Sequence, residues 1–239
     1  MTLLTVSKLS KKYPNTHVLD NISFNVKQGE FISIFGPNGC GKSTLLNIIS
    51  GLDRRYTGSV SFTDKGIKKA YIFQNADESV LPWKSITENV RLDNKTLKTR
   101  RIKEVLSELK LWKFRDAYPY QLSGGMKQLL AIARAFVHGC DVLFLDEPFS
   151  SLDYHMASAA RERLLNLWQK ERPTVLFVSH DIDEAILLSD RVLVFSNRPS
   201  RIKQEVEIKL PRNRDASILS SKQFLEYKKI IMDCVKNEI

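Results

Sequence analysis

An octapeptide near the N-terminus has the residue types and spacing of a phosphate-binding loop. Residues 36–43, Gly-Pro-Asn-Gly-Cys-Gly-Lys-Ser, match the pattern G-x-x-x-x-G-K-[ST]. Its three glycines allow successive backbone N–H groups to converge on phosphate oxygens at the positive end of a following helix. Lys42 is expected to reach the β- and γ-phosphates, and the Ser43 hydroxyl to hold Mg²⁺. The residues expected to contact a nucleoside triphosphate are Gly36, Pro37, Asn38, Gly39, Cys40, Gly41, Lys42, Ser43 and Thr44.

The segments on both sides of this loop have the local structure that the motif requires. Ile32-Ser-Ile-Phe35 is a short apolar run typical of a strand. Residues 42–49 carry leucine and isoleucine at helical spacing, and Gly51 is expected to end that helix. The alternative is a glycine-rich turn that matches by chance, and the flanking strand and helix argue against it.

Two adjacent carboxylates follow a second apolar run, in Asp-Val-Leu-Phe-Leu-Asp-Glu-Pro at 141–148. A buried strand of this kind delivers Asp146 and Glu147 to the carboxyl edge of a parallel sheet, where ligands bind in open α/β folds. Asp146 fits the role of holding Mg²⁺, and Glu147 that of the general base for the attacking water. The alternative is a solvated turn or helix cap, which the upstream phosphate loop disfavours.

A third apolar run, Thr174–Val178, ends at Ser179-His180. The sequence Asp181-x-x-Glu184 that follows predicts the start of a helix. His180 could therefore donate a hydrogen bond to the γ-phosphate and to the attacking water.

The segment Leu-Ser-Gly-Gly-Met-Lys-Gln at 122–128 combines a helix cap with two glycines. Ser123 is a good N-cap, and the apolar spacing beyond it predicts a helix that runs to Gly139. Gly124 and Gly125 in the first turn would leave bare N–H groups able to meet an anion. The alternative for Ser-Gly-Gly taken alone is a flexible turn.

With these residues in place, the chain resembles the ATP-binding subunit of an ABC transporter over nearly its whole length. Residues 122–128 match the family signature, Gln74 the glutamine loop, and Ser151-Leu152-Asp153 the D-loop. His180 matches the switch histidine, and Tyr13 stands where the family stacks an aromatic ring on adenine. The resemblance implies an ATPase, with ATP and Mg²⁺ as its cofactors.

The resemblance also implies the fold and the division of roles. The fold would be α/β, a P-loop NTPase core with a mostly parallel sheet, an N-terminal antiparallel β-subdomain and a helical signature subdomain. Two copies would face each other head to tail, so that Ser123, Gly124 and Gly125 of one copy cover the ATP held by the other. The implied catalytic residues are Glu147, His180 and Gln74; the implied metal ligands are Ser43, Gln74 and Asp146; the further implied nucleotide contacts are Tyr13, Gln128 and Asp153.

Weaker motifs resemble one branch of that family, which imports nitrate, sulfonates, taurine, bicarbonate and some vitamin precursors. They are Leu81-Pro82-Trp83, residues 85–90, 198–202 and 210–214. Ser200 departs from the branch, where glycine is common. The likeness implies a homodimer working with transmembrane permease subunits and an extracytoplasmic binding protein, at the cytoplasmic side of the membrane. Trp83 suits an interface anchor, with a core aromatic as the alternative.

The whole chain, 1–239, is expected to be a single ATPase domain with internal lobes. Residues 1–84 and 140–212 would form the catalytic lobe, 85–139 a helical insertion and 213–239 a helical extension. Ser85-x-x-Glu88 predicts a capping box at the start of the insertion, and 97–111 shows a second helical period.

Bulk properties leave rival functions to weigh. The net charge of +10, from 37 basic and 27 acidic residues, allows a soluble ABC ATPase acting on nucleic acid or ribosomes. The spacing of 81 positions between Lys42 and Ser123 leaves no room for the long coiled coils of chromosome-type members, and a single motif set does not match two-cassette translation factors. We therefore expect no nucleic-acid partner. A regulatory protein that binds ATP without turnover is disfavoured by Glu147, His180 and Gln74.

The remaining features concern location and surface. No stretch approaches the roughly 18 apolar residues that cross a bilayer, and no secretion signal is expected. Three separated cysteines suggest neither disulfides nor a zinc site. A basic cluster near the C-terminus could face nucleic acid, anionic lipid or only solvent; its members are Arg198, Arg201, Lys203, Lys209, Arg212 and Arg214.

Overall fold

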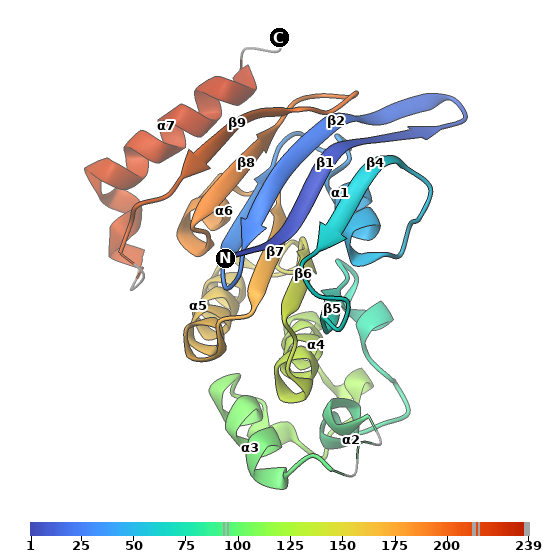
Figure 1. Cartoon of the computed structure of the whole chain (residues 1–239). Helices are drawn as coiled ribbons and strands as arrows, with labels where there is room; N and C mark the ends of the chain where they lie inside the picture. Colours follow the sequence, from blue (N-terminus) through green and yellow to red (C-terminus); the bar gives the residue numbers. More distant parts are fainter. Residues whose placement is uncertain (93, 95, 212–213, 215, 237–239) are drawn as a thin grey trace. The chain divides into compact units, whose positions relative to one another are not determined.

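The computed structural model describes residues 1–92, 94, 96–211, 214 and 216–236. The chain divides into two compact units, one made of Met1–Ile67 with Thr174–Ile239 and the other of Lys68–Pro173. Their elements are drawn in Figure 1. The lobe boundaries expected from the sequence stay a prediction. Arg212 and Asn213, and with them the start of the expected C-terminal extension, lie outside the described residues.

The first unit contains an antiparallel sheet of three strands. They are β1 (Thr2–Tyr13), β2 (Thr16–Lys27) and β4 (Thr57–Phe62). β1 lies in the middle, with β2 on one side and β4 on the other. Residues alternate between buried and exposed along β2, as expected for a sheet with one face on the core. The antiparallel β-subdomain implied by the resemblance is confirmed.

The same unit contains a second, mostly parallel set of strands. They are β3 (Phe31–Phe35), β7 (Thr174–Ser179), β8 (Arg191–Phe195) and β9 (Ile202–Glu207). β3 pairs in parallel with both β7 and β8, and β9 runs antiparallel to β8. Every residue of β3 and β7 is buried, which explains their mostly apolar sequences; the polar residues among them, Ser33, Thr174 and Ser179, are buried too. The expected strand at Ile32–Phe35 is confirmed.

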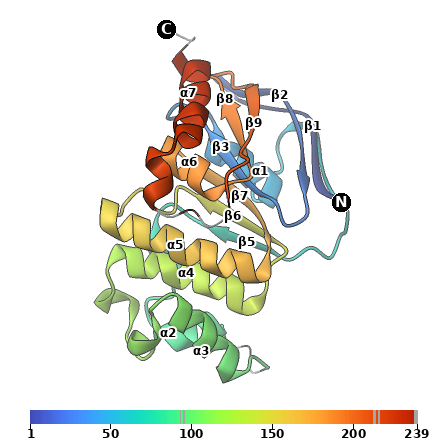
Figure 2. The same ribbon diagram turned by 90° about the vertical axis from the view of Figure 1, so that its left-hand side faces the viewer.

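Three helices accompany these strands. They are α1 (Lys42–Ser50), α6 (Ile182–Leu188) and α7 (Lys222–Lys236), with a 3₁₀ turn at Ala216–Ser220. Phe224 and Ile231 of α7 pack with Ile186 of α6 and Val194 of β8 in one apolar cluster. Figure 2 shows α6 and α7 on the same side of β8 and β9. The C-terminal helix is therefore part of the core of this unit.

The basic cluster predicted near the C-terminus is largely occupied by internal contacts. Arg214 Nη1 donates to the carbonyls of Ile186, Leu187 and Ser189, and so caps the end of α6. Burial lowers the pKa of Arg214 to about 10. Arg201 forms an ion pair with Asp20. Arg214 is therefore not part of a solvated basic face, whereas the Arg201 side chain remains 69% exposed.

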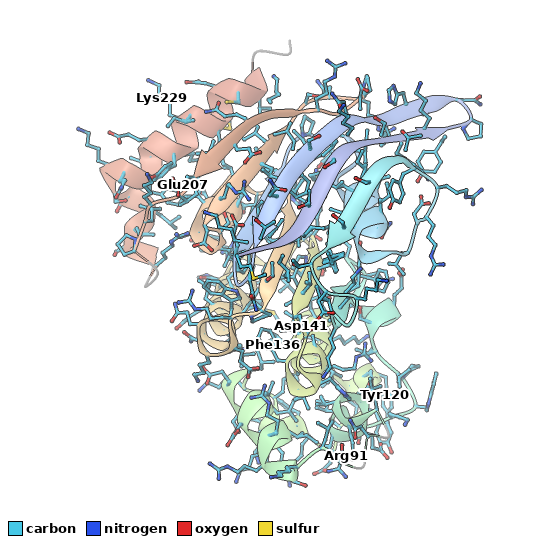
Figure 3. All side chains as sticks on the ribbon, in the orientation of Figure 1. Arg91, Tyr120, Phe136, Asp141, Glu207 and Lys229 are labelled. Atoms are coloured by element: carbon cyan, nitrogen blue, oxygen red, sulfur yellow. The ribbon has the colours of Figure 1, made fainter. Side chains whose placement is uncertain are left out.

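The second unit combines one parallel strand pair with helices. Its strands are β5 (Lys69–Ile72) and β6 (Val142–Asp146), and its helices are α2 (Ile86–Arg91), α3 (Thr99–Glu108), α4 (Gly124–His138) and α5 (Tyr154–Glu171). Short 3₁₀ turns occupy Ala76–Ser79, Trp112–Phe114 and Pro119–Gln121. Figure 2 shows α4 and α5 lying alongside each other. Phe136 of α4, labelled in Figure 3, is fully enclosed in this unit.

Local sequence signals predicted the starts and ends of these helices, except that α3 is shorter than expected. The capping box of Ser85 and Glu88 is present at the start of α2, and α4 ends at its cap Gly139 as expected. The helical period of 97–111 produces a shorter helix, because α3 ends at Glu108 and Lys110 takes a positive φ of 58°. Leu109 and Leu111 are nevertheless buried. The apolar spacing therefore predicted which residues are buried, but not where the helix ends.

Candidate functional site

The phosphate-binding loop joins β3 to α1, as its motif requires. Gly39 and Gly41 have φ values of 75° and 117°, which residues with a Cβ rarely adopt, and Gly41 is the N-cap of α1. Lys42 is only 4% exposed, and its Nζ lies 2.9 Å from the Gly36 carbonyl and 3.0 Å from that of Pro37. The lysine ammonium is thereby held by carbonyls of its own loop, and its contact with phosphate oxygens stays a prediction.

Close packing fixes the backbone of this loop. A Cβ on Gly41 would lie 2.6 Å from Val18 Cγ1, so this glycine is required by space as well as by φ. Ser200 is fully buried, and its Oγ contacts the carbonyls of Cys40 and Ser196. The serine that departs from the family branch therefore supports the loop directly.

His180 follows β7 and is exposed. Phe35 of β3 pairs with Ser179 of β7 in parallel register, so the loop and His180 leave the same edge of the sheet from neighbouring strands. Asp181 caps α6 through its side chain, which accepts from the N–H groups of Asp183 and Glu184. The helix start predicted after His180 is confirmed.

Tyr13 ends β1 and is 47% exposed. Lys11 Nζ lies 4.7 Å from the centroid of the tyrosine ring and 2.5 Å from Asp53 Oδ2. This contact holds one side of the ring without burying it. Stacking of Tyr13 on adenine stays a prediction.

The acidic pair stands at the end of β6 in the second unit. Asp146 is 8% exposed, and Glu147 has a left-handed φ of 45°. Such a conformation is unfavourable for a residue with a Cβ and is often retained at functional positions. Gln74 Nε2 lies 3.4 Å from Glu147 Oε2 and 3.3 Å from Ser150 Oγ. The expected glutamine and the expected base are therefore direct neighbours.

Tyr71 is a neighbour of Asp146 that sequence reasoning missed. Its Oη donates a hydrogen bond of 3.1 Å to Asp146 Oδ2. Burial, followed by the charge of Asp146, raises the pKa of Tyr71. Nothing in the sequence marks this tyrosine, because the contact depends on which strand pairs with β6.

The signature segment begins α4. Ser123 caps the helix by accepting from the Met126 N–H at 3.3 Å, as expected. A Cβ on Gly124 would meet no atom within 4 Å. A Cβ on Gly125 would lie 2.9 Å from the side-chain ends of Leu152 and Met156. Only Gly125 is constrained by packing within this unit.

Gln128 and Asp153 have structural partners. Gln128 is 2% exposed, and its Nε2 donates to the Phe73 carbonyl at 3.1 Å. Asp153 caps α5 by accepting from the Met156 N–H at 2.9 Å. Their expected roles in nucleotide binding stay predictions.

Comparison with known proteins decides the family. A family model described as ABC transporter matches residues 19–150. The chain is 44% identical to an uncharacterized ABC transporter ATP-binding protein of Methanocaldococcus jannaschii, over 92% of this chain and 85% of that relative. The chain belongs to the ABC transporter family. As an ATP-binding subunit of this family, it binds and hydrolyses ATP.

Other comparisons agree with this assignment. The ABC subunit is 40% identical to the aliphatic sulfonates import ATP-binding protein SsuB of Bacillus cereus, over 95% of this chain and 92% of the relative. A dimeric post-hydrolysis ATP-binding cassette bound to ADP and phosphate superposes with a TM-score of 0.74 at 28% identity, covering 87% of this chain and all of that one. The cbiO1 subunit of Clostridium perfringens gives a TM-score of 0.77 at 26% identity, covering 97% and 96% of the two chains.

The ABC subunit offers the donor types that Mg²⁺ prefers. Asp146 provides a carboxylate at a strand end, Gln74 an amide oxygen, and Ser43 an exposed hydroxyl in the first turn of α1. Mg²⁺ binds through oxygen ligands and one or two carboxylates in such sites. The residues fit the ion that the family implies.

The segment before α2 presents an aromatic side chain to solvent. Trp83 is 70% exposed, so the alternative of a core aromatic is wrong. Asn89 is buried and joins four backbone groups: its Oδ1 accepts from the Leu81 N–H, and its Nδ2 donates to the carbonyls of Leu81, Lys84 and Ser85. Tyr120, labelled in Figure 3, is another exposed aromatic, at 76%.

None of the helices traced among the described residues is both long and apolar enough to span a bilayer.

Proposed function

We propose that this chain powers the import of a small organic anion, with sulfonates as the cargo class. The observation that carries the proposal is the 40% identity, over 95% of the chain, with a protein named as an aliphatic sulfonates import subunit. Nitrate, taurine, bicarbonate and vitamin precursors are the other cargoes of the branch that the sequence resembles. Taurine is itself a sulfonate, and nitrate and a thiamine precursor are the competing cargoes in the test below.

The proposed roles in ATP hydrolysis follow from side-chain chemistry. Lys42 and the backbone N–H groups of the non-proline residues within 36–43 bind the β- and γ-phosphates. Ser43, Gln74 and Asp146 would hold Mg²⁺, which would supply positive charge to neutralise the phosphates.

Glu147 accepts the proton of the attacking water, and Gln74, 3.4 Å from its carboxylate, orients that carboxylate. His180 donates a hydrogen bond to the γ-phosphate, where negative charge accumulates. Tyr13 stacks on adenine, and Asp153 and Gln128 support the nucleotide contacts of the closed state.

Two copies of the chain are proposed to close on two ATP molecules. Ser123, Gly124 and Gly125 of one copy would bring their N–H groups to the γ-phosphate held by the other. The likeness to a dimeric cassette bound to ADP and phosphate supports this arrangement. The open space around Gly124 supports it too, because no packing within the unit calls for a glycine there.

The homodimer is proposed to work at the cytoplasmic face of the membrane with transmembrane permease subunits. Trp83 would anchor a short helix of a permease, since exposed tryptophans are enriched among residues that dominate binding energy. An extracytoplasmic binding protein would deliver the cargo.

Uptake in cells tests the cargo. A strain that lacks this chain is supplied with the parental protein or with Lys42→Ala, and uptake of a labelled alkanesulfonate, nitrate and a thiamine precursor is measured. We expect alkanesulfonate uptake to be lost in the strain, restored by the parental chain and not by Lys42→Ala. Unchanged alkanesulfonate uptake together with lost uptake of another solute would overturn the sulfonate assignment.

A further inference from the structure

Tyr71 and Asp146 come together through the register of two parallel strands. Tyr71 of β5 pairs with Phe144 of β6. Side chains two residues apart on a strand lie on the same face, so Asp146 follows Phe144 on the face that Tyr71 occupies. The Tyr71 Oη donates to Asp146 Oδ2 at 3.1 Å. Pairing thus brings a phenol to the carboxylate from a position 75 residues earlier in the chain.

Neighbouring aromatic rings hold the tyrosine in place. The Tyr71 ring centroid lies 4.6 Å from that of Phe73, with an interplanar angle of 36°. It lies 6.1 Å from the centroid of Phe144, at 23°. These contacts restrict rotation of the Tyr71 side chain, and so they fix the position of its hydroxyl.

The tyrosine hydroxyl is the donor of this contact. A phenol O–H carries a hydrogen to give, and an ionised carboxylate has only lone pairs to accept it. The carboxylate oxygen that it contacts is correspondingly an acceptor. The direction of the hydrogen bond is therefore fixed by the chemistry of both partners.

We propose that Tyr71 is a positioning residue for Mg²⁺: by donating to Oδ2 of Asp146 it sets the orientation in which this carboxylate meets the ion. The inference rests on the proposed role of Asp146 as a metal ligand. Groups that hydrogen-bond to a metal ligand orient it and tune its affinity, and losing them weakens metal binding about 10–100-fold. Tyr71 contacts the carboxylate of Asp146 and not the reacting atoms, so its substitution should affect hydrolysis only by weakening metal binding.

Phenylalanine is the sharpest substitution because it removes only the hydroxyl. Tyr71→Phe keeps both ring contacts and should fold. The matched control is Tyr227→Phe, since the Tyr227 Oη accepts a 3.0 Å hydrogen bond from the Lys209 N–H in the other unit. Both variants lose one hydrogen-bonded phenol, and only Tyr71 adjoins Asp146.

Binding of Mn²⁺ in place of Mg²⁺ provides a readout other than activity. All variants carry Glu147→Gln to suppress hydrolysis, and protein is kept in excess over ATP. Free Mn²⁺ is then followed by electron paramagnetic resonance as the metal is titrated. We expect Tyr71→Phe to raise the Mn²⁺ dissociation constant by about 10-fold or more, with ATP affinity in the absence of metal unchanged. Tyr227→Phe should leave both constants at their parental values.

A third variant, Asp146→Asn, separates failure of this inference from failure of the site itself. Weak metal binding in Asp146→Asn with parental metal binding in Tyr71→Phe would overturn the positioning role alone. Parental metal binding in Asp146→Asn would remove Asp146 from the metal site and the inference with it. If Tyr71→Phe weakens metal-free ATP binding as much as it weakens Mn²⁺ binding, the tyrosine is a structural residue and the proposal fails.

Discussion

The amide of Gln74 donates to the carboxylate of Glu147 across 3.4 Å, at the point where Glu147 adopts a left-handed φ of 45°. The Ser150 hydroxyl also lies beside Gln74, at 3.3 Å, and donates to the Glu147 carbonyl at 2.9 Å. One unfavourable backbone conformation is thus surrounded by three polar contacts. Gln74 therefore contacts the side chain of Glu147, and Ser150 contacts its main chain.

Glu147→Gln should lower kcat for ATP hydrolysis by about 10²–10⁴-fold, because an amide cannot accept the proton of the attacking water. ATP binding should persist, since the phosphate loop is untouched. Steady-state phosphate release and equilibrium nucleotide binding measure the two effects. The control is Glu162→Gln, the same chemical change at an exposed position of α5. Hydrolysis at the parental rate would show that Glu147 is not the base.

Gly124→Ala should separate folding from assembly. A Cβ at Gly124 meets no atom within 4 Å, and alanine is favoured over glycine in a helix by about 1 kcal/mol. The free energy of unfolding should therefore stay level or rise, while ATP hydrolysis falls because the added methyl group obstructs the approach to the second copy's phosphate.

Unfolding in urea and ATPase assays check this expectation, and Gly66→Ala serves as the control because its Cβ would make only ordinary contacts, the nearest at 3.6 Å. Parental hydrolysis in Gly124→Ala, with dimerisation retained, would argue against a composite site.

Gln128→Leu should destabilise the chain by about 1–3 kcal/mol, because the Phe73 carbonyl loses its donor within a partly buried contact. The affinity of the isolated chain for ATP should not change. The matched control is Gln223→Leu, an exposed glutamine whose replacement should cost less than about 0.5 kcal/mol. Parental stability combined with weaker ATP binding would instead make Gln128 a nucleotide contact, as the sequence suggested.

Asn89→Ala should lower the stability of the chain, whereas Trp83→Ala should weaken permease binding and leave stability nearly unchanged. Asn89 satisfies four backbone groups around Leu81–Ser85, so its loss should cost at least about 1–3 kcal/mol in unfolding free energy. Trp83 is 70% exposed, and its loss should change stability by less than about 0.5 kcal/mol while weakening co-purification with permease subunits. Destabilisation by Trp83→Ala equal to that of Asn89→Ala would make the tryptophan structural.

The sequence by itself determined the elements whose signals are local. The glycines of residues 36–43, the Ser123 cap and the Ser85–Glu88 capping box work through neighbours within a few positions, and all appear as expected. Mostly apolar runs marked β3, β6 and β7, because strands buried on both faces carry few polar side chains. The same dependence on local pattern explains why α3 was expected to be longer than it is: the apolar spacing continues past Glu108 into a buried turn.

Tertiary structure alone decided which distant residues meet. Tyr71 reaches Asp146, Gln128 reaches Phe73, and Arg214 caps α6, across separations of 75, 55 and 25–28 positions. The periodicity of apolar residues in the sequence determines the face on which a side chain lies, but not which strand or helix packs against that face. Pairing of β5 with β6 and packing of α7 against α6 supply that information, because burying apolar area selects one arrangement among many compatible with the same local signals.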